Sequence, residues 1–452
     1  MAPSDQKVGQ HSLLERLMFR FGPSIISLYL FATLWLLFAQ GDRELYYNIL
    51  KWWGFIPYHY PFVDIQTIFI ALDCWRDAVD VFVRNSCLFG GWYSYSPILL
   101  WAATLPIGPD DHTWFGIVFG IAFLLVLSAL PPCNSWKECW IRSLATISTI
   151  TAYGVERTEF DLLIFMIAMA GILLLLRFSR ARFAGYAILV FAAFLKYYPA
   201  VLMVLAARER FRTAMWVAAA TICAALIFLL PTMGQTQQAL GMTPVGSPFA
   251  DFFGARNLPL GLTLIASGPL PMADDELFRI PLSAPGQVAM GLLLLFAAWA
   301  VWRRVRTDAQ RVSTLPNAEL TFLSAGCVVM VGCFFAIQNV PQRATFLLMT
   351  LPGLLMLART DDAGRRPMLL VCGVLFLLWD GLFYRLVGAF TARYEAFAIL
   401  HFLYWLAREL VWWWVMARLA SLLIAFLWRS PALAPVLDFL RIPRPGHALA
   451  AG

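Results

Sequence analysis

Four aspartates fall within residues 58–87 of a chain that is otherwise rich in apolar residues. A carboxylate beside a bilayer costs free energy unless it is solvated, paired or functional, so this segment is the first place to look for chemistry. Asp64 stands alone among apolar and aromatic residues near the start of the segment. Because desolvation there would favour proton uptake, we predict that Asp64 acts as a general base.

The other three aspartates have the spacing of one helical face: Asp73, Asp77 and Asp80. Two basic residues, Arg76 and Arg84, are close enough in sequence to pair with them. The same pattern fits a solvated amphipathic helix lying on the membrane, and the sequence leaves both interpretations open.

Further polar groups lie beside other apolar segments. Lys196 lies in the middle of an apolar run, where a lysine needs an anionic partner, a cavity or a path to the interface. Arg343 precedes another apolar run, and a guanidinium at a helix start favours a phosphate. One short turn holds Glu156, Arg157, Glu159 and Asp161, and it could also be a solvated loop. Tyr95, within "WYSYSPILLW", is by itself typical of an interfacial aromatic anchor.

The eight cysteines include no CxxC pair and no His/Cys spacing typical of a metal site. Cys74 and Cys87 could form a disulfide in an oxidising compartment, and two free thiols fit the sequence equally well. We therefore predict no bound metal or other cofactor.

The elements that position these residues are predicted to be membrane helices. Hydrophobic residues make up 61% of the 452 positions, charged residues 13%, and the mean hydropathy is +0.71. Recurrent apolar runs have about the 20 residues that cross a bilayer core. We predict an all-α, polytopic helical bundle of about 10–12 transmembrane helices, a broken or re-entrant pair among them, with long extracytoplasmic loops.

The net charge of +7 does not point to nucleic acid, because the basic residues lie in short loops. They concentrate in segments 177–183, 208–212, 303–318 and 359–366, whereas the long segments 41–113 and 232–285 are richer in carboxylates. The positive-inside rule places the short loops in the cytoplasm and the two long segments outside.

With a cytoplasmic N-terminus over 1–21, the membrane domain is predicted to cover 22–416. Ten spans are predicted, near 22–40, 114–130, 141–155, 160–176, 213–231, 286–302, 319–337, 344–358, 367–385 and 396–415. Most of them carry no charge in mid-helix. The stretch "LVWWWVMARL" is typical of an interfacial aromatic belt, and 417–452 is predicted to be an interfacial helix and a cytoplasmic tail.

Residues 184–207 form an apolar run with arginine on both sides and Pro199 near its middle. Arginine at both ends favours a cytoplasmic location for both, and the proline removes a helical hydrogen bond. A re-entrant pair of half-helices satisfies both facts, and a single kinked span is the alternative.

These motifs together resemble glycosyltransferase family 87, within the GT-C superfamily of integral-membrane transferases that use polyprenyl-phosphate sugars. The resemblance covers about residues 58–210 and 335–355. It is carried by "DIQTIFIALDCWRDAVDVF", "YSYSP", "AGYAILVFAAFLKYYP" and "QNVPQRATFLLMTLP". Where relatives often have Gly-Asn after the arginine, this chain has Thr158 and Glu159.

The resemblance implies an inverting transferase, mannosyltransferase-like, with Asp64 as its base. The residues expected to bind substrate are Tyr95, Arg157, Asp161, Lys196, Tyr198, Arg256, Asn339 and Arg343. The donor would be a polyprenyl-phosphate sugar and the acceptor a glycolipid or glycan. The expected location is a plasma membrane, the bacterial inner membrane foremost, with the site on the extracytoplasmic side.

Two other functions remain open. A transporter or flippase for a lipid-linked sugar would also need a basic phosphate site and a groove open to lipid. A non-catalytic membrane scaffold is compatible with the Thr158 and Glu159 departure.

Overall fold

The computed structural model describes residues 12–55, 58, 60–89, 93–178, 180–242, 246–267, 280–336, 338–360, 365–391 and 397–440. These parts are helical and contain no strand, apart from one isolated antiparallel bridge between Phe253 and Asn339. The all-α class is therefore confirmed for the described residues.

Seven helical segments in the described ranges are long and apolar enough to cross a membrane. They are α1 (Leu13–Ala39), Pro109–Leu127 with α4 (His112–Leu127), α7 (Phe160–Arg177), α9 (Phe211–Gly241), α12 (Ala284–Val312), α13 (Asn317–Ala336) and α17 (Phe397–Arg429). An eighth crossing is made if α15 (Arg365–Leu378) and α16 (Asp380–Thr391), bent by 67°, count as one span. The chain is thus a multi-pass membrane protein.

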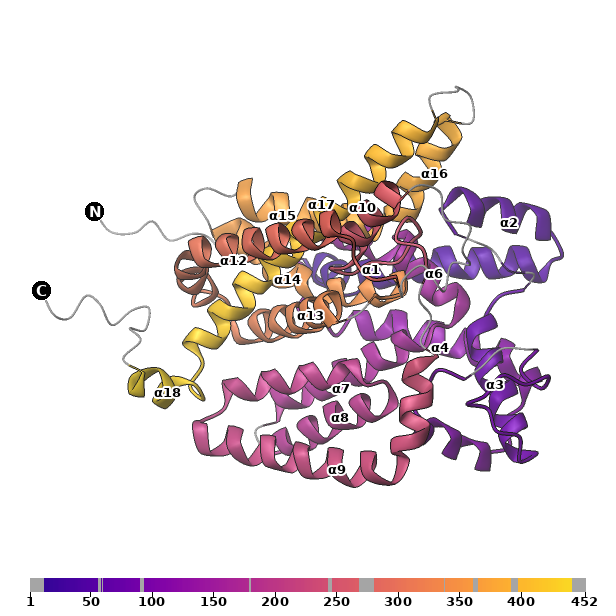
Figure 1. Cartoon of the computed structure of the whole chain (residues 1–452), viewed down its shortest axis with the longest axis horizontal. Coiled ribbons are helices and arrows are strands. Elements are labelled where there is room, and N and C mark those ends of the chain that lie inside the picture. Colours follow the sequence, from indigo (N-terminus) through magenta and orange to yellow (C-terminus); the bar gives the residue numbers. More distant parts are fainter. Residues whose placement is uncertain are drawn as a thin grey trace, which may run out of the picture.

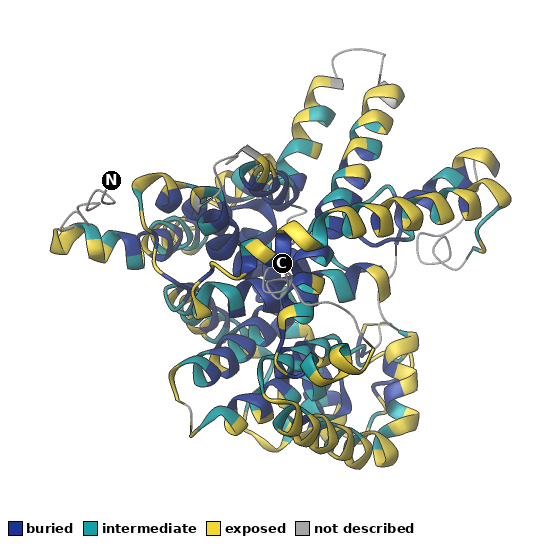
Figure 2. Ribbon diagram, turned by 90° about the vertical axis from the view of Figure 1, so that its left-hand side faces the viewer, coloured by how far each residue is buried: buried dark blue, intermediate teal, exposed yellow. Residues whose placement is uncertain are grey.

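The helices lie in two layers along the long axis of the molecule (Figure 1). α7, α8 (Arg182–Leu195) and α9 lie side by side in one layer, while α12, α13, α14 (Leu347–Thr360), α15 and α17 form the other. Apolar side chains on α9 and α12 are widely exposed, Ile227 and Leu295 among them. Figure 2 shows such exposed residues on the outer faces of peripheral helices and buried ones toward the centre, as a bilayer-embedded bundle requires.

Three predicted spans are wrong as single helices, and one of them, 367–385, is broken between α15 and α16 with a bend of 67°. The span at 141–155 is broken into α5 (Trp136–Thr146) and α6 (Thr149–Arg157). At the break, the carbonyl of Ile147 accepts a hydrogen bond of 3.2 Å from the Trp53 indole, so a side chain from another element satisfies it. The span at 344–358 begins as a 3₁₀ segment, η4 (Pro341–Phe346), before α14.

The segment 184–207 is the predicted re-entrant pair. α8 ascends to Leu195, the chain turns at Lys196, and the 3₁₀ segment η3 (Tyr198–Arg208) returns beside it. The two ends meet: Arg182 forms a 3.2 Å ion pair with Glu209, and the Tyr186 hydroxyl donates to the same carboxylate. Lys196 therefore lies at the apex of the pair, inside the protein.

Two helices extend beyond the predicted boundaries at 232 and 417. α9 continues through Pro231 to Gly241, so the second long loop starts later and contains the short helix α10 (Asn257–Ser267). α17 continues to Arg429 because residues after Ala417 still pack: the Ser421 hydroxyl donates to Asp308 at 2.6 Å. A short helix, α18 (Ala434–Phe439), follows, and residues 441–452 of the predicted tail lie outside the described part.

The first long loop contains α2 (Arg43–Trp52), α3 (Val63–Arg76) and the 3₁₀ segments η1 (Pro97–Thr104) and η2 (Pro109–Asp111). Cys74 and Cys87 are joined by a disulfide. Arg76 pairs with Asp73, one turn earlier on α3. Because α3 ends at Arg76, Asp80 lies beyond the helix, and the expectation that it shares a helical face with Asp73 is wrong.

Candidate active site

Asp64 does not stand alone. It lies in the first turn of α3. Arg157, at the end of α6, donates hydrogen bonds to both of its carboxylate oxygens. The Arg157 Nε donates to Oδ2 at 2.9 Å, and a second guanidinium nitrogen bonds Oδ1. The Tyr153 hydroxyl and the Tyr58 ring complete the contacts of this guanidinium. The sequence could not show this pairing because 93 residues separate the partners.

The turn after Arg157 places two more carboxylates in the site. Thr158 has a left-handed backbone, φ 53°, and reverses the chain between α6 and α7. Glu159 then precedes α7, and Asp161 lies in its first turn. The four charges of this short turn are therefore not a solvated loop, because Glu156, Glu159 and Asp161 are all buried.

Lys196 and Arg343 converge on Asp161. The Lys196 amine bonds Asp161 and lies 3.4 Å from Glu159. The Arg343 Nε lies 3.4 Å from the other Asp161 oxygen, and its guanidinium stacks over the Tyr198 ring at 4.4 Å. The Tyr198 hydroxyl donates to Asp161 at 3.1 Å. A lysine from the re-entrant pair and an arginine from η4 thus share one buried carboxylate.

Glu159 joins the two halves of the cluster. Its carboxyl group lies 3.4 Å from the Lys196 amine and close enough to Asp64 for that residue to influence its pKa. Burial raises the pKa of Glu159 to about 8, with a further contribution from the Asp64 charge, although Lys196 opposes the shift. Glu159 is therefore protonated at neutral pH. From the sequence, Glu159 was noted only as a departure from the family pattern, and a role for its carboxyl group in the site was not predicted.

These groups line a cavity of about 500 Å³. Its walls include Asp64, Tyr95, Arg157, Glu159, Lys196, Tyr198 and Arg343 from the cluster, and Ala250, Asp251 and Phe252 from the second long loop. Tyr95 is confined by the Phe160 ring, at 5.4 Å, and by the Lys196 amine over its own ring. The cavity is large enough for one or two sugar rings and their phosphate.

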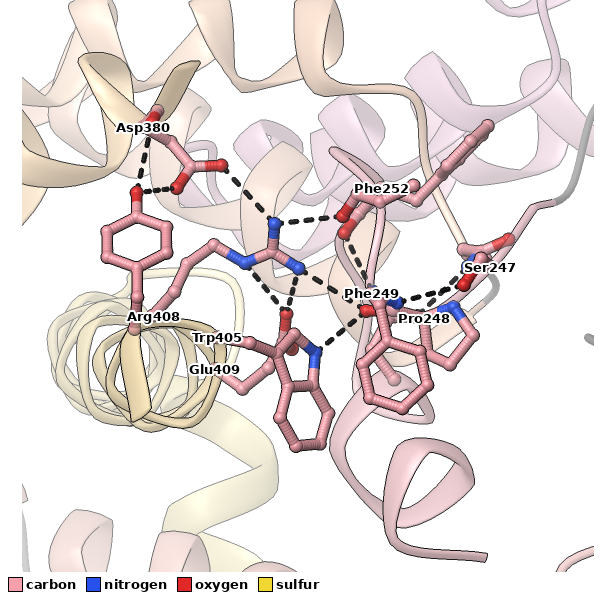
Figure 3. A network of polar contacts seen from close by, with 12 residues as sticks. Ser247, Pro248, Phe249, Phe252, Asp380, Trp405, Arg408 and Glu409 are labelled. Carbon is pink, nitrogen blue, oxygen red and sulfur yellow. Dashed lines mark hydrogen bonds and ion pairs between the residues drawn. The ribbon is translucent and has the colours of Figure 1, made fainter. Parts of the chain in front are cut away.

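A second charged cluster holds the loop wall of the cavity. Figure 3 shows the Arg408 guanidinium between the carboxylates of Asp380 and Glu409 and the carbonyls of the loop. Arg408 donates to the carbonyl of Ala250 at 2.8 Å, and Trp405 donates to that of Pro248 at 2.8 Å. The last predicted span is therefore an exception to the expectation that most spans carry no charge in mid-helix.

Two candidate residues lie elsewhere. Arg256 is not among the residues lining the cavity and donates to the carbonyl of Ile280. Asn339 is buried behind Arg343 and accepts a hydrogen bond from it, so it positions the guanidinium. The "WWW" belt is also wrong: Trp412 and Trp413 are buried, and Trp412 stacks on Phe253 at 4.4 Å. In the described residues no group of three His, Cys, Asp or Glu side chains could hold a metal.

No family model, curated protein or solved structure matches this chain.

An apolar groove begins beside the charged cavity. It has a volume of about 300 Å³ and is lined by side chains of α1, α4 and α6, among them Trp35, Ile121 and Val155. Its polar end is Glu156, which accepts a 3.0 Å hydrogen bond from the Tyr46 hydroxyl. The next residue, Arg157, lines the charged cavity. The polar and apolar sites are thus adjacent.

Proposed function

We propose that this protein is an inverting glycosyltransferase that moves a sugar, mannose or a similar one, from a polyprenyl-phosphate carrier to a glycolipid or polysaccharide acceptor. One observation carries the proposal: a single cavity beside an apolar groove is lined by the candidate base Asp64 and by three cations. The cations are Arg157, Lys196 and Arg343. A lipid-phosphate sugar has the same division into an apolar tail and an anionic polar head. The motif order of family 87 supports the same assignment.

The chemistry requires one carboxylate to accept the proton of the acceptor hydroxyl. Attack on the anomeric carbon then forms the new glycosidic bond while the bond to the carrier phosphate breaks, and the phosphate leaves with the electron pair. One base and one leaving group invert the anomeric configuration; a retaining enzyme would need a carboxylate nucleophile on the carbon itself. Asp64, in contact with the cavity, is the proposed base.

The charge of the cluster suits this substrate. Arg157, Lys196 and Arg343 face the carboxylates of Asp64 and Asp161, while Glu159 is protonated at neutral pH. These six side chains together carry one excess positive charge, which matches the single negative charge of a phosphodiester. Asp251 is a further acidic residue of the cavity wall, and burial raises its pKa. During reaction the leaving phosphate gains a second negative charge, and preorganised cations stabilise it. Arg343 and Lys196 are the proposed phosphate ligands, and Arg157 holds Asp64 in place.

The test compares wild type with Asp64→Asn for transfer from radiolabelled polyprenyl-phosphate sugars to membrane acceptors. We expect transfer by the wild type and a loss of about 10³-fold in the variant, the middle of the range for a lost general base. Asp73→Asn, on the same helix and outside the cavity, is the matched control. Equal transfer by wild type and Asp64→Asn rules out this base.

A flippase for a lipid-linked sugar is the second candidate, because the apolar groove could also hold the lipid tail of a transported molecule. Its signature would be donor movement across a vesicle bilayer that survives Asp64→Asn. Donor binding with neither transfer nor movement would indicate a scaffold. The proposed location of the cavity, on the extracytoplasmic side of a bacterial inner membrane, is tested by labelling single cysteines introduced at Lys51 and Arg212 from each side.

A further inference from the structure

A second polar cavity, of about 420 Å³, lies between α12, α15 and α17. Five arginines line it: Arg303, Arg304, Arg311, Arg366 and Arg418. Arg418 is ten positions beyond Arg408 on α17, about 15 Å along the helix axis from the residue that holds the loop wall of the candidate active site. The cavity is therefore separate from that site.

The cations of this pocket outnumber its anions. Asp308 is the carboxylate in the lining, and it pairs with Arg418 at 3.2 Å and with Arg311 at 3.6 Å. In the described parts of the chain, no salt bridge joins Arg303 or Arg304 to a carboxylate. Arg304 experiences the repulsive charges of Arg418, Arg366 and Arg311 and the attractive charge of Asp308, so repulsive contributions outnumber the attractive one. A bound anion would relieve this repulsion.

The wall toward the middle of the bundle is apolar and aromatic. Phe296 and Trp299 are about half exposed at the pocket, at 46% and 50%, and Trp414 faces it from α17. The Arg303 guanidinium lies over the Trp299 ring at 5.3 Å. A pocket with arginines at one end and tryptophan and phenylalanine at the other matches the headgroup level of a bilayer, where aromatic side chains concentrate.

We propose that this pocket binds the phosphate of an anionic membrane lipid, such as phosphatidylglycerol, at the end of the bundle that the arginine-rich loops predict to be cytoplasmic. Guanidinium groups bind phosphate oxygens through paired hydrogen bonds. Basic pockets between transmembrane helices attract anionic headgroups on that side. The aromatic wall would contact the start of the acyl chains, which a free phosphate lacks.

The experiment measures retention of phosphatidylglycerol by the purified full-length protein, using native mass spectrometry of zwitterionic nanodiscs with graded phosphatidylglycerol. The test variant is Arg303→Gln/Arg304→Gln. The matched control is Arg306→Gln, an exposed residue of the same helix that does not line the pocket. Thermal unfolding in phosphatidylcholine alone establishes that both variants are folded.

We expect the double variant to bind phosphatidylglycerol about 30-fold more weakly, from about 5-fold for each arginine lost near a membrane surface. The Arg306→Gln control should match the wild type. Equal loss in both variants, or equal retention of phosphatidylcholine and phosphatidylglycerol, would overturn the proposal. In a parallel arm, millimolar inorganic phosphate should not displace the lipid; displacement would assign the pocket to a soluble phosphate instead.

Discussion

The clusters of buried charge around Asp161 and around Arg408 differ in what their side chains face. The partners of the buried Asp161 line a cavity, which side chains of α3, α6, η3 and η4 reach. The Arg408 guanidinium instead forms its contacts within the protein, with two carboxylates and with loop carbonyls. We call this group the inward-facing cluster. Burial of charge by itself therefore does not identify a reaction centre. Access to a cavity separates the cluster suited to chemistry from the one that holds a loop.

The largest effect on folding stability is expected from a substitution in the inward-facing cluster. Arg408→Met removes the partner of Glu409, which is completely buried, and removes the hydrogen bond to the carbonyl of Ala250, while the carbonyl of Pro248 keeps Trp405 as its donor. Removing one partner of a buried ion pair costs about 3–5 kcal/mol of folding stability. We expect a loss of that size in detergent unfolding. Arg429→Met, exposed on the same helix, should change it little. An unchanged unfolding free energy in Arg408→Met would show that the cluster does not hold the fold.

The matching change in the cavity should act on catalysis more than on stability. In Lys196→Met, Asp161 keeps Arg343 and the Tyr198 hydroxyl as partners, so the carboxylate is not left isolated. A preorganised donor to a developing charge contributes about 10²–10³ in rate, and transfer should fall by that factor. Transfer by single-turnover assay is the measurement, with exposed Lys137→Met as the control. If Lys196→Met loses as much stability as Arg408→Met but keeps its turnover per folded molecule, both clusters serve stability. The proposed difference between them would then be wrong.

A pH series sharpens the role of Glu159. Its pKa is raised to about 8 by burial and by Asp64, so it is neutral below that pH and ionised above it. Ionisation removes the excess positive charge, and donor affinity should weaken as the pH rises through about 8. Because burial raises this pKa from 4.5 to about 8, the stability contributed by the neutral form is lost as the pH rises from about 4.5 to about 8.

Glu159→Gln, which stays neutral, provides the control for this series. Its donor affinity should be nearly independent of pH between 7 and 9, while the wild type loses affinity, as measured by equilibrium binding of a labelled polyprenyl-phosphate sugar. A pH dependence that persists unchanged in Glu159→Gln would assign the titration to another group.

The sequence predicted the class, the chain reversal within 184–207 and six of the residues that line the cavity, because apolar periodicity, flanking arginines and Pro199 act locally. It failed where partners come from distant elements. Asp64 seemed isolated because Arg157 is far away in the chain, and Arg408 and Glu409 were overlooked because a single pair of charges hardly lowers the hydropathy of α17. The break in 141–155 depends on Trp53 from another element, which no local pattern of that segment contains.

The smallest expected effect concerns Thr158, which separates the Arg157 and Glu159 halves of the cavity cluster. Its positive φ is a conformation that a β-branched residue adopts at a cost of about 1–2 kcal/mol, and its buried hydroxyl has no hydrogen-bond partner in the described structure. Thr158→Gly removes both penalties but increases the entropy of the unfolded chain by about 0.5–1 kcal/mol. We therefore expect a net gain of up to about 1 kcal/mol in unfolding free energy, with transfer retained. Thr158→Ala, which loses the hydroxyl but keeps the backbone cost, separates the two contributions; a gain equal to that of glycine would place the penalty in the hydroxyl and not in the backbone.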